Sequence, residues 1–209
     1  MLETVLAEEM DVSRAPVREA LRQLEVDGLV CFTANQGAAV HTLTKKEIWE
    51  IFTARSVIEG YVAALAAEQA TPQDLLRLRS VSESGIIAAA AGDLKETINK
   101  DFETHRLIWE ISGHVIFYEI LSRLETRIRL FMSVQASLFT NLFESIREHQ
   151  EIYQAIANKD PETARKIIQN HINKAGLLAF DHEMESGIPQ ESFTSISLSE
   201  DFAAGEIIT

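Results

Sequence analysis

The chain has 209 residues, 46% of them hydrophobic, which suits a globular protein of one or two domains. Its apolar runs are far shorter than the ~20 residues of a bilayer-spanning helix, and no secretion signal opens it, so we expect a cytoplasmic protein without a membrane segment. With 32 acidic and 19 basic residues, the net charge of −13 argues against non-specific nucleic-acid binding but leaves room for a local basic cluster.

Residues 1–43 predict a small unit with its own pattern. A short amphipathic helix over residues 2–10 is followed by a tight break. Ser13 is a suitable N-cap for a second helix, which ends at Gly28. Two short strands around a turn that contains Gly37 come next. Helix, tight turn, helix and hairpin form the layout of a winged helix-turn-helix.

The second helix of this unit carries two different faces. Arginines recur every four residues on one face, where they are able to pair with guanine or grip phosphates in a major groove. The alternative is that the row is only the solvated face of a surface helix. Gly37 would let the hairpin backbone approach the minor groove closely. The arginines are Arg14, Arg18 and Arg22, and the predicted buried stripe consists of Val17, Leu21, Leu24 and Val26.

The stretch from Leu6 to Val30 resembles the DNA-reading half of GntR-type bacterial regulators, through the Ser-Arg-x-Pro-Val-Arg-Glu-Ala-Leu core at residues 13–21. Ala15 departs from the hydroxyl residue usual there, so one phosphate contact is expected to be absent. The family's first helix should precede Leu2, which implies a truncated winged helix-turn-helix that either starts late or no longer reads DNA. The DNA contacts implied by the resemblance are Ser13, Arg14, Arg18 and Arg22, with Gly37 in the wing.

From Thr44 onward the sequence predicts helices only. A capping box opens the first helix at Thr44, and a cap followed by proline opens two others at Thr71 and Asp160. Short connections predict antiparallel neighbours, so the expected fold class is mainly α, with the winged unit followed by an antiparallel bundle of about six helices. The expected ranges are 44–67, 71–91, 93–113, 115–138, 141–158 and 160–180, and the fourth should bury a stripe of Ile116, Ile120, Leu124, Ile128 and Phe131.

The predicted domains are a DNA-binding head over residues 1–43, an all-helical effector-binding domain over 44–180 and a tail over 181–209. The tail holds seven acidic residues and no Lys or Arg. About half of the chain's excess negative charge therefore lies there, and its composition predicts weak order.

Asp101 and His105 lie one helical turn apart on an otherwise apolar face, so both should point inward. Burying them is costly unless a salt bridge or a metal ion pairs with them. His149 and His171 share the apolar stripes of two later helices. A lone histidine on such a face is more often a satisfied core residue, but facing helices that gather histidines and a carboxylate are how bundles build metal sites. Three histidines and an aspartate suit Zn, Ni, Co, Mn or Fe(II), and ligand type alone does not choose among these ions, of which Zn is the one we expect.

The same region resembles the FCD effector-binding domain of the FadR branch of GntR regulators. The shared features are Asp101-x-x-x-His105, the Glu-His-Gln-Glu-Ile-Tyr segment at 148–153, Asp160-Pro161 and His171. In metal-containing members an aspartate and three histidines hold the ion, so the resemblance implies that role for Asp101, His105, His149 and His171. A histidine at 114 replaces the family's common asparagine and is expected at a helix start.

Together these features predict a metabolite-responsive transcriptional regulator, not an enzyme, that acts on operator DNA as a homodimer and binds a divalent metal ion and a small organic acid. Arg55, inward-facing in the first bundle helix, is the expected grip for the effector's carboxylate, and Arg127 is a second candidate. The alternative for Arg55 is a structural salt bridge with an internal acid. The alternatives for the chain are a metal-dependent enzyme and an effector-binding protein without a working DNA head. The enzyme is disfavoured because the sequence offers no further core-facing Glu or His near the cluster to act as general base.

Overall fold

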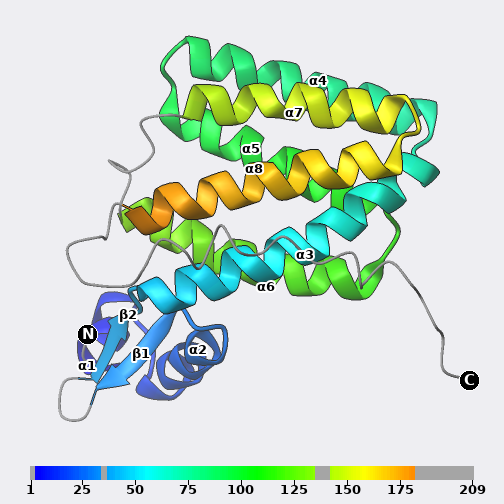
Figure 1. The fold of residues 1–209 in the computed structure, drawn as a ribbon. Helices are drawn as coiled ribbons and strands as arrows, with labels where there is room; N and C mark the ends of the chain where they lie inside the picture. Colours follow the sequence, from blue (N-terminus) through cyan, green and yellow to red (C-terminus); the bar gives the residue numbers. More distant parts are fainter. Residues whose placement is uncertain (1–2, 34–36, 135–141, 182–209) are drawn as a thin grey trace, which may run out of the picture.

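The computed structural model describes residues 3–33, 37–134 and 142–181, and it confirms the mainly α fold class. A small N-terminal unit, called the head below, stands at one end of a helical bundle (Figure 1). None of the helices in the described ranges is long and apolar enough to cross a membrane. The head contains α1 (Glu3–Glu9), α2 (Arg14–Val26), β1 (Val30–Thr33) and β2 (Gly37–Val40), and the bundle contains α3 (Lys45–Gln69), α4 (Pro72–Ala90), α5 (Leu94–Ile111), α6 (Val115–Val134), α7 (Leu142–Ala157) and α8 (Pro161–Asp181).

The head has a small core of its own. β1 and β2 pair antiparallel, with Val30 opposite Val40 and Thr33 opposite Gly37. The prediction for Val26 was wrong, because its side chain is 79% exposed. Val26 lies nine residues after Val17. Nine residues are two and a half turns of an α-helix, so the two side chains point in opposite directions. The buried residues are Ala7, Val17, Leu21, Val30 and Ala38, with Leu6 and Leu24 packed against them.

Local capping explains where the bundle helices begin. The Thr44 hydroxyl accepts a hydrogen bond from the Glu47 N–H, and the Glu47 carboxylate accepts one from the Thr44 N–H. Thr71 and Asp74 form the same reciprocal pair at the start of α4, where Pro72 has no N–H to satisfy. The Asp160 carboxylate accepts from the Thr163 N–H at the start of α8. The capping signals in the sequence therefore located these three helix starts correctly.

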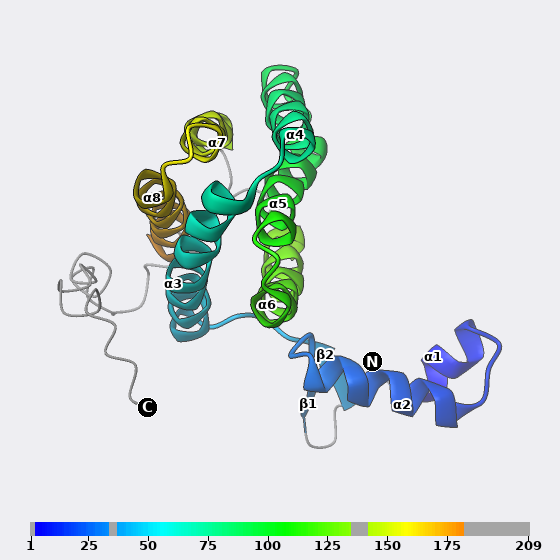
Figure 2. The ribbon, with the colours of Figure 1, turned by 90° about the vertical axis from the view of Figure 1, so that its right-hand side faces the viewer.

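Helix α3 is the centre of the bundle. In the end-on view it lies between the α7–α8 side and the stack of α4, α5 and α6 (Figure 2). Its residues Val62, Ala63, Ala66 and Ala67 are fully buried. Glycines let it approach α8 closely, since a Cβ on Gly60 or Gly176 would collide with a side chain of the other helix. Helix α3 therefore contacts helices on more than one side, and this position lets it contribute to a site inside the bundle.

The buried face of α6 differs from the predicted stripe. Ile116 and Ile120 are 59% and 40% exposed, whereas Leu121 is fully buried. The buried face instead runs from Leu121 through Ile128 to Phe131, because periodicity alone does not say which of two adjacent apolar rows meets the neighbouring helices. The predicted end of this helix at 135–138, the start of the next at 140–141 and the tail from 182 onward lie outside the described residues.

We expect Gly176→Ala to destabilise the fold, although alanine is the better helix former by ~1 kcal/mol. The added Cβ would lie 2.9 Å from the Cβ of Phe52, a buried residue of α3. Overpacking of this kind costs about 1–3 kcal/mol, measurable by chemical denaturation. Gly85→Ala is the matched comparison, because its Cβ would meet the flexible end of Ile146 at 3.2 Å. A Gly176→Ala variant as stable as the wild type would contradict the close α3–α8 contact.

Candidate functional site

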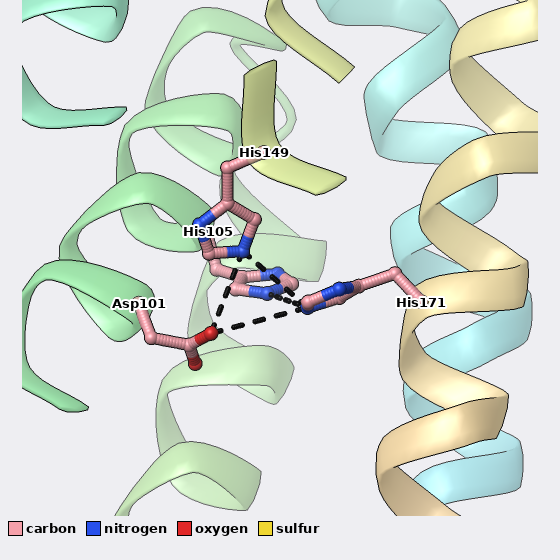
Figure 3. A group of neighbouring side chains, drawn as sticks. All are labelled: Asp101, His105, His149 and His171. Carbon is pink, nitrogen blue, oxygen red and sulfur yellow. Dashed lines mark hydrogen bonds and ion pairs between the residues drawn. The ribbon is translucent and has the colours of Figure 1, made fainter. Parts of the chain in front are cut away.

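Four polar side chains meet inside the bundle (Figure 3). Asp101 and His105 come from α5, His149 from α7 and His171 from α8, and one ligand atom of each lies within 4.8 Å of all the others. The three histidines are buried and Asp101 is nearly so. The structure thus brings together all four residues that the sequence singled out as candidate metal ligands.

The distances among these atoms suit a single small cation. The Nε2 atom of His171 lies 3.1 Å from Nε2 of His105 and 3.4 Å from Nε2 of His149. Oδ1 of Asp101 lies 3.4 Å from Nε2 of His149 and 3.9 Å from Nε2 of His171. Ligands at about 2.0–2.2 Å from an ion, with angles of about 90–110°, are about 2.9–3.6 Å apart. Three of these four spacings fall in that range, the fourth corresponds to a wider angle, and the remaining pairs of ligand atoms lie within 4.8 Å.

Two of the histidines are oriented by carboxylates on their far side. Nδ1 of His105 lies 2.5 Å from Oε2 of Glu59, and Nδ1 of His171 lies 2.9 Å from Oε2 of Glu148. An ionised carboxylate only accepts hydrogen bonds, so each Nδ1 carries the proton and donates it. In the neutral imidazole the Nε2 atom then holds an unshared electron pair. Such carboxylate–histidine pairs are typical of metal ligands.

This arrangement leaves two electron pairs facing each other. With both Nδ1 atoms acting as donors, neither Nε2 of neutral His105 nor that of neutral His171 has a proton to offer across the 3.1 Å between them. A cation between them, either a proton or a metal ion, removes this repulsion. The donor set of three imidazoles and one carboxylate fits a divalent metal ion.

His149 differs from the other two histidines. Its Nδ1 is buried and has no hydrogen-bond partner among the described residues. Burial lowers the pKa of His149 well below its usual range, and repulsion from the protonated forms of His171 and His105 and from Arg55 lowers it further. The ring is therefore neutral at physiological pH, which is the form that binds metal ions.

Arg55 lies behind the site in a buried ion pair. Its Nε is 2.6 Å from Oε1 of Glu59, which is fully buried. Burial raises the pKa of Glu59, but the charges of Arg55 and His105 and the hydrogen bonds from His105 and Trp109 outweigh it and hold the pKa at about 2. The pair corresponds to the structural salt bridge that was the alternative interpretation of Arg55.

Arg127 lies where the head meets the bundle. Its Nη2 is 2.8 Å from Oε1 of Glu47, and its guanidinium side chain lies against Gly28 at the end of α2. The same Oε1 atom is 2.9 Å from Nε2 of His41, which follows β2. The described contacts of Arg127 thus join the two parts of the chain and do not include the four-residue cluster.

The predicted DNA contacts lie on the surface of the head. Ser13 is the exposed N-cap of α2, and its side chain makes no capping hydrogen bond. Arg18 donates two hydrogen bonds of 3.0 and 3.1 Å to Oε2 of Glu3, and Arg14 lies 3.6 Å from the same atom. Arg22 is exposed on the same helix. Gly37 begins β2 with a φ of +77°, a conformation that suits glycine.

The two carboxylates that orient the histidines were not predicted from the sequence. Glu59 lies four residues after Arg55, a spacing typical of a helical ion pair, so that signal was present. Glu148 directly precedes His149, and this position gives no indication that it contacts His171 on another helix. Only the packing of α3 and α8 against α5 and α7 reveals both contacts.

Comparisons with known proteins bear on the two parts of the chain and on its fold. Residues 1–40 match the family described as bacterial regulatory proteins, gntR family, and residues 50–174 match the FCD domain. The HTH-type transcriptional regulator McbR of Escherichia coli is 31% identical over 173 residues, which cover 80% of this chain and 78% of McbR. The uncharacterized HTH-type transcriptional regulator YdhC of Bacillus subtilis is 28% identical, with 82% and 77% covered. A solved structure of E. coli McbR/YncC superimposes with a TM-score of 0.74 at 26% identity and covers 87% of each chain.

We expect Glu47→Gln to weaken the fold at neutral pH only. Burial raises the pKa of Glu47, but hydrogen bonds from Thr44 and His41 outweigh it and lower the pKa to about 2. Because the folded-state pKa is depressed, the ionised group stabilises the fold above pH 4.5, and this contribution disappears as the pH falls towards 2. Glutamine keeps the capping box but loses the charge, so we expect a loss of about 1 kcal/mol at pH 7.

Chemical denaturation of both proteins between pH 7 and pH 2.5 measures this difference. Other carboxylates titrate in both proteins and cancel in the comparison. A difference in the free energy of unfolding that stays constant across the pH range would contradict the assignment.

Proposed function

The chain belongs to the GntR family of bacterial transcriptional regulators and carries an FCD domain, and from this we propose that its bundle senses a small carboxylate through a bound divalent metal ion. Members of this family are DNA-binding regulators and not enzymes. The single observation that carries the proposal is the convergence of Asp101 with three histidine Nε2 atoms in the bundle interior. We propose residues 1–43 as the DNA-binding head, 44–180 as the effector-binding domain and the remainder as a tail.

The proposed metal ligands are Asp101, His105, His149 and His171. Zn suits the donor set, and Ni, Mn, Co or Fe are compatible with it. Four protein ligands leave one or two positions open on an ion that accepts five or six. A small organic acid is able to fill these positions, so the ion serves as an electrophilic anchor for the effector's carboxylate.

Arg55 is the proposed second contact for the effector. It pairs with Glu59, which in turn contacts His105, so it lies near the cluster. The pair with Glu59 engages Nε, and a guanidinium has two further nitrogen atoms able to donate to a carboxylate. Arg127 has less support in this role, since its described contacts are with Glu47 and Gly28.

On the DNA side, Ser13, Arg14, Arg18, Arg22 and Gly37 are the proposed contacts with operator DNA. Glu3 holds Arg14 and Arg18 in the absence of DNA, so phosphates or guanines have to displace an exposed carboxylate. Exposed ion pairs contribute little free energy, and this exchange is therefore inexpensive. A two-fold homodimer is proposed because operator half-sites mirror protein symmetry.

Elemental analysis of the purified protein tests the metal centre. We expect about one divalent metal ion per chain in the wild type and loss of most of it in His149→Ala, because a ligand is removed. His114→Ala is the matched control, since His114 stacks on Phe117 and takes no part in the cluster. Equal metal content in wild type and His149→Ala would contradict the proposed ligand set.

Gel-shift titrations with the intergenic DNA upstream of the gene test the head. We expect Arg18→Ala to weaken binding about tenfold or more and to lower the salt dependence by about one counterion. Arg79→Ala is the matched control, because Arg79 is also exposed and paired with one carboxylate but lies on α4. Unchanged DNA binding by Arg18→Ala, or an equal loss in the control, would contradict the proposed interface.

A further inference from the structure

Glu59 is a fully buried carboxylate that receives hydrogen bonds from two other helical positions besides its own ion pair. Its Oε2 atom accepts from Nδ1 of His105 at 2.5 Å and from Nε1 of Trp109 at 3.0 Å, both on α5. Its Oε1 atom accepts from Nε of Arg55 at 2.6 Å on α3. A buried carboxylate loses its hydration, and three donors are what compensates this loss. Both carboxylate oxygens of Glu59 therefore have hydrogen-bond donors that fix the orientation of the carboxylate.

These contacts restrict His105 in two ways. The carboxylate accepts only, so it selects the tautomer with the proton on Nδ1 and leaves the electron pair on Nε2. Trp109 lies one helical turn after His105 and donates to the same oxygen, which fixes where that oxygen sits. The His105 ring consequently presents Nε2 towards Nε2 of His171, and Figure 3 shows this pair within the four-residue cluster.

We propose that Glu59 is the positioning residue of the metal centre, which holds His105 as a ready-made ligand and ties the ion to helix α3. The inference rests on the proposed function, because it assumes that the four-residue cluster binds an ion. Glu59 does not touch the ion and acts through His105. In carboxylate–histidine–metal sites, loss of the carboxylate typically weakens metal binding 10–100-fold.

Glu148 is the natural point of comparison within the same site. It holds Nδ1 of His171 at 2.9 Å, but its side chain is 20% exposed and it is shared with Lys174 on the surface. Water is able to replace part of what Glu148 supplies, whereas no water reaches Glu59. His149 has no such carboxylate among the described residues. The three histidines are thus held to different degrees, and His105 is held most firmly.

Helix α3 gives the Glu59 contact a wider consequence. The helix begins beside the head, where Glu47 in its first turn joins His41 and Arg127. Glu59 follows twelve residues later on the same helix, about 18 Å along its axis. An ion bound by His105 is therefore linked, through Glu59, to the helix whose first turn contacts the head.

The test measures the affinity of the metal-free protein for Zn²⁺ and Co²⁺ by competition with a chromophoric chelator. We expect Glu59→Gln to weaken binding of both ions 10–100-fold, because glutamine offers one oxygen to three donors. Glu148→Gln should weaken it less. Glu125→Gln is the matched control, since Glu125 is also buried and paired with two arginines, Arg106 and Arg129, but contacts no histidine. Its affinity should stay within about twofold of the wild type.

A second variant keeps the test decisive if Glu59→Gln fails to fold. The pair Arg55→Met with Glu59→Leu replaces the buried ion pair by apolar side chains and leaves no orphaned charge, a change that bundles often tolerate. We expect it to fold, as judged by circular dichroism, and to bind both ions at least 10-fold more weakly than the wild type. In the metal-free wild type, nitrogen NMR of the imidazoles should also find His105 with its proton on Nδ1.

The outcomes separate the two proposals. Wild-type affinity in folded Glu59 variants, or a His105 ring with its proton on Nε2, would overturn the role of Glu59 and leave the metal centre standing. A wild-type chain that takes up neither Zn²⁺ nor Co²⁺ would overturn the proposed metal centre and this inference with it. A loss in Glu125→Gln as large as that in Glu59→Gln would show that any buried carboxylate has the same effect, which also overturns the inference.

Discussion

Carboxylates and imidazoles lose their hydration when a helical bundle encloses them, and this loss costs several kcal/mol for each charged group that finds no replacement for water. The bundle meets this constraint by connecting its polar groups to one another. Glu59 accepts from three donors, and Glu148 accepts from His171 and Lys174. What remains unmatched is a cluster of ring nitrogens that face each other, and this is where we propose that a cation binds.

This constraint also explains the unusual composition of α3. A central helix with apolar neighbours on several sides would ordinarily be apolar throughout, and α3 does bury a run of alanines and valine. Yet it buries Arg55 and Glu59 in the same region, where the two neutralise each other and Glu59 contacts His105 of α5. Its first turn is different, because Glu47 there is partly exposed and holds His41 and Arg127. One helix thus carries the polar contacts of both the bundle interior and the junction with the head.

The chain as a whole is acidic, but helix α2 of the head carries a row of three exposed arginines. The net charge of −13 disfavours contact with any polyanion at long range, so specific binding has to come from a local surface. Arg14, Arg18 and Arg22 on α2 form the surface that we propose for this contact, and Glu3 pairs with the first two of them. Val17 and Leu21 of the same helix are buried in the small apolar core of the head, whereas the three arginines are exposed.

Much of the fold and four members of the candidate site followed from the sequence, since their signals are local. Hydroxyl caps and prolines mark helix starts within a stretch of four residues. Asp101 and His105 are one helical turn apart on an apolar face, and this spacing indicates that both side chains point inward. The choice between adjacent apolar rows was not local, so the predictions for Val26, Ile116 and Ile120 were wrong. Which row is buried depends on where the neighbouring helices lie.

The sequence by itself therefore determined the helical class, the winged head and the identity of the clustered donors. Only the tertiary structure decided which carboxylates contact the histidines from the other side. Glu59 reaches His105 across 46 residues and Glu148 reaches His171 across 23, and these contacts depend on how helices pack, which spacing along one helix does not encode. The position of Arg127 beside Glu47, 80 residues away, was decided in the same way. Periodicity reports the direction of a side chain, whereas the packing of helices decides which partner it meets.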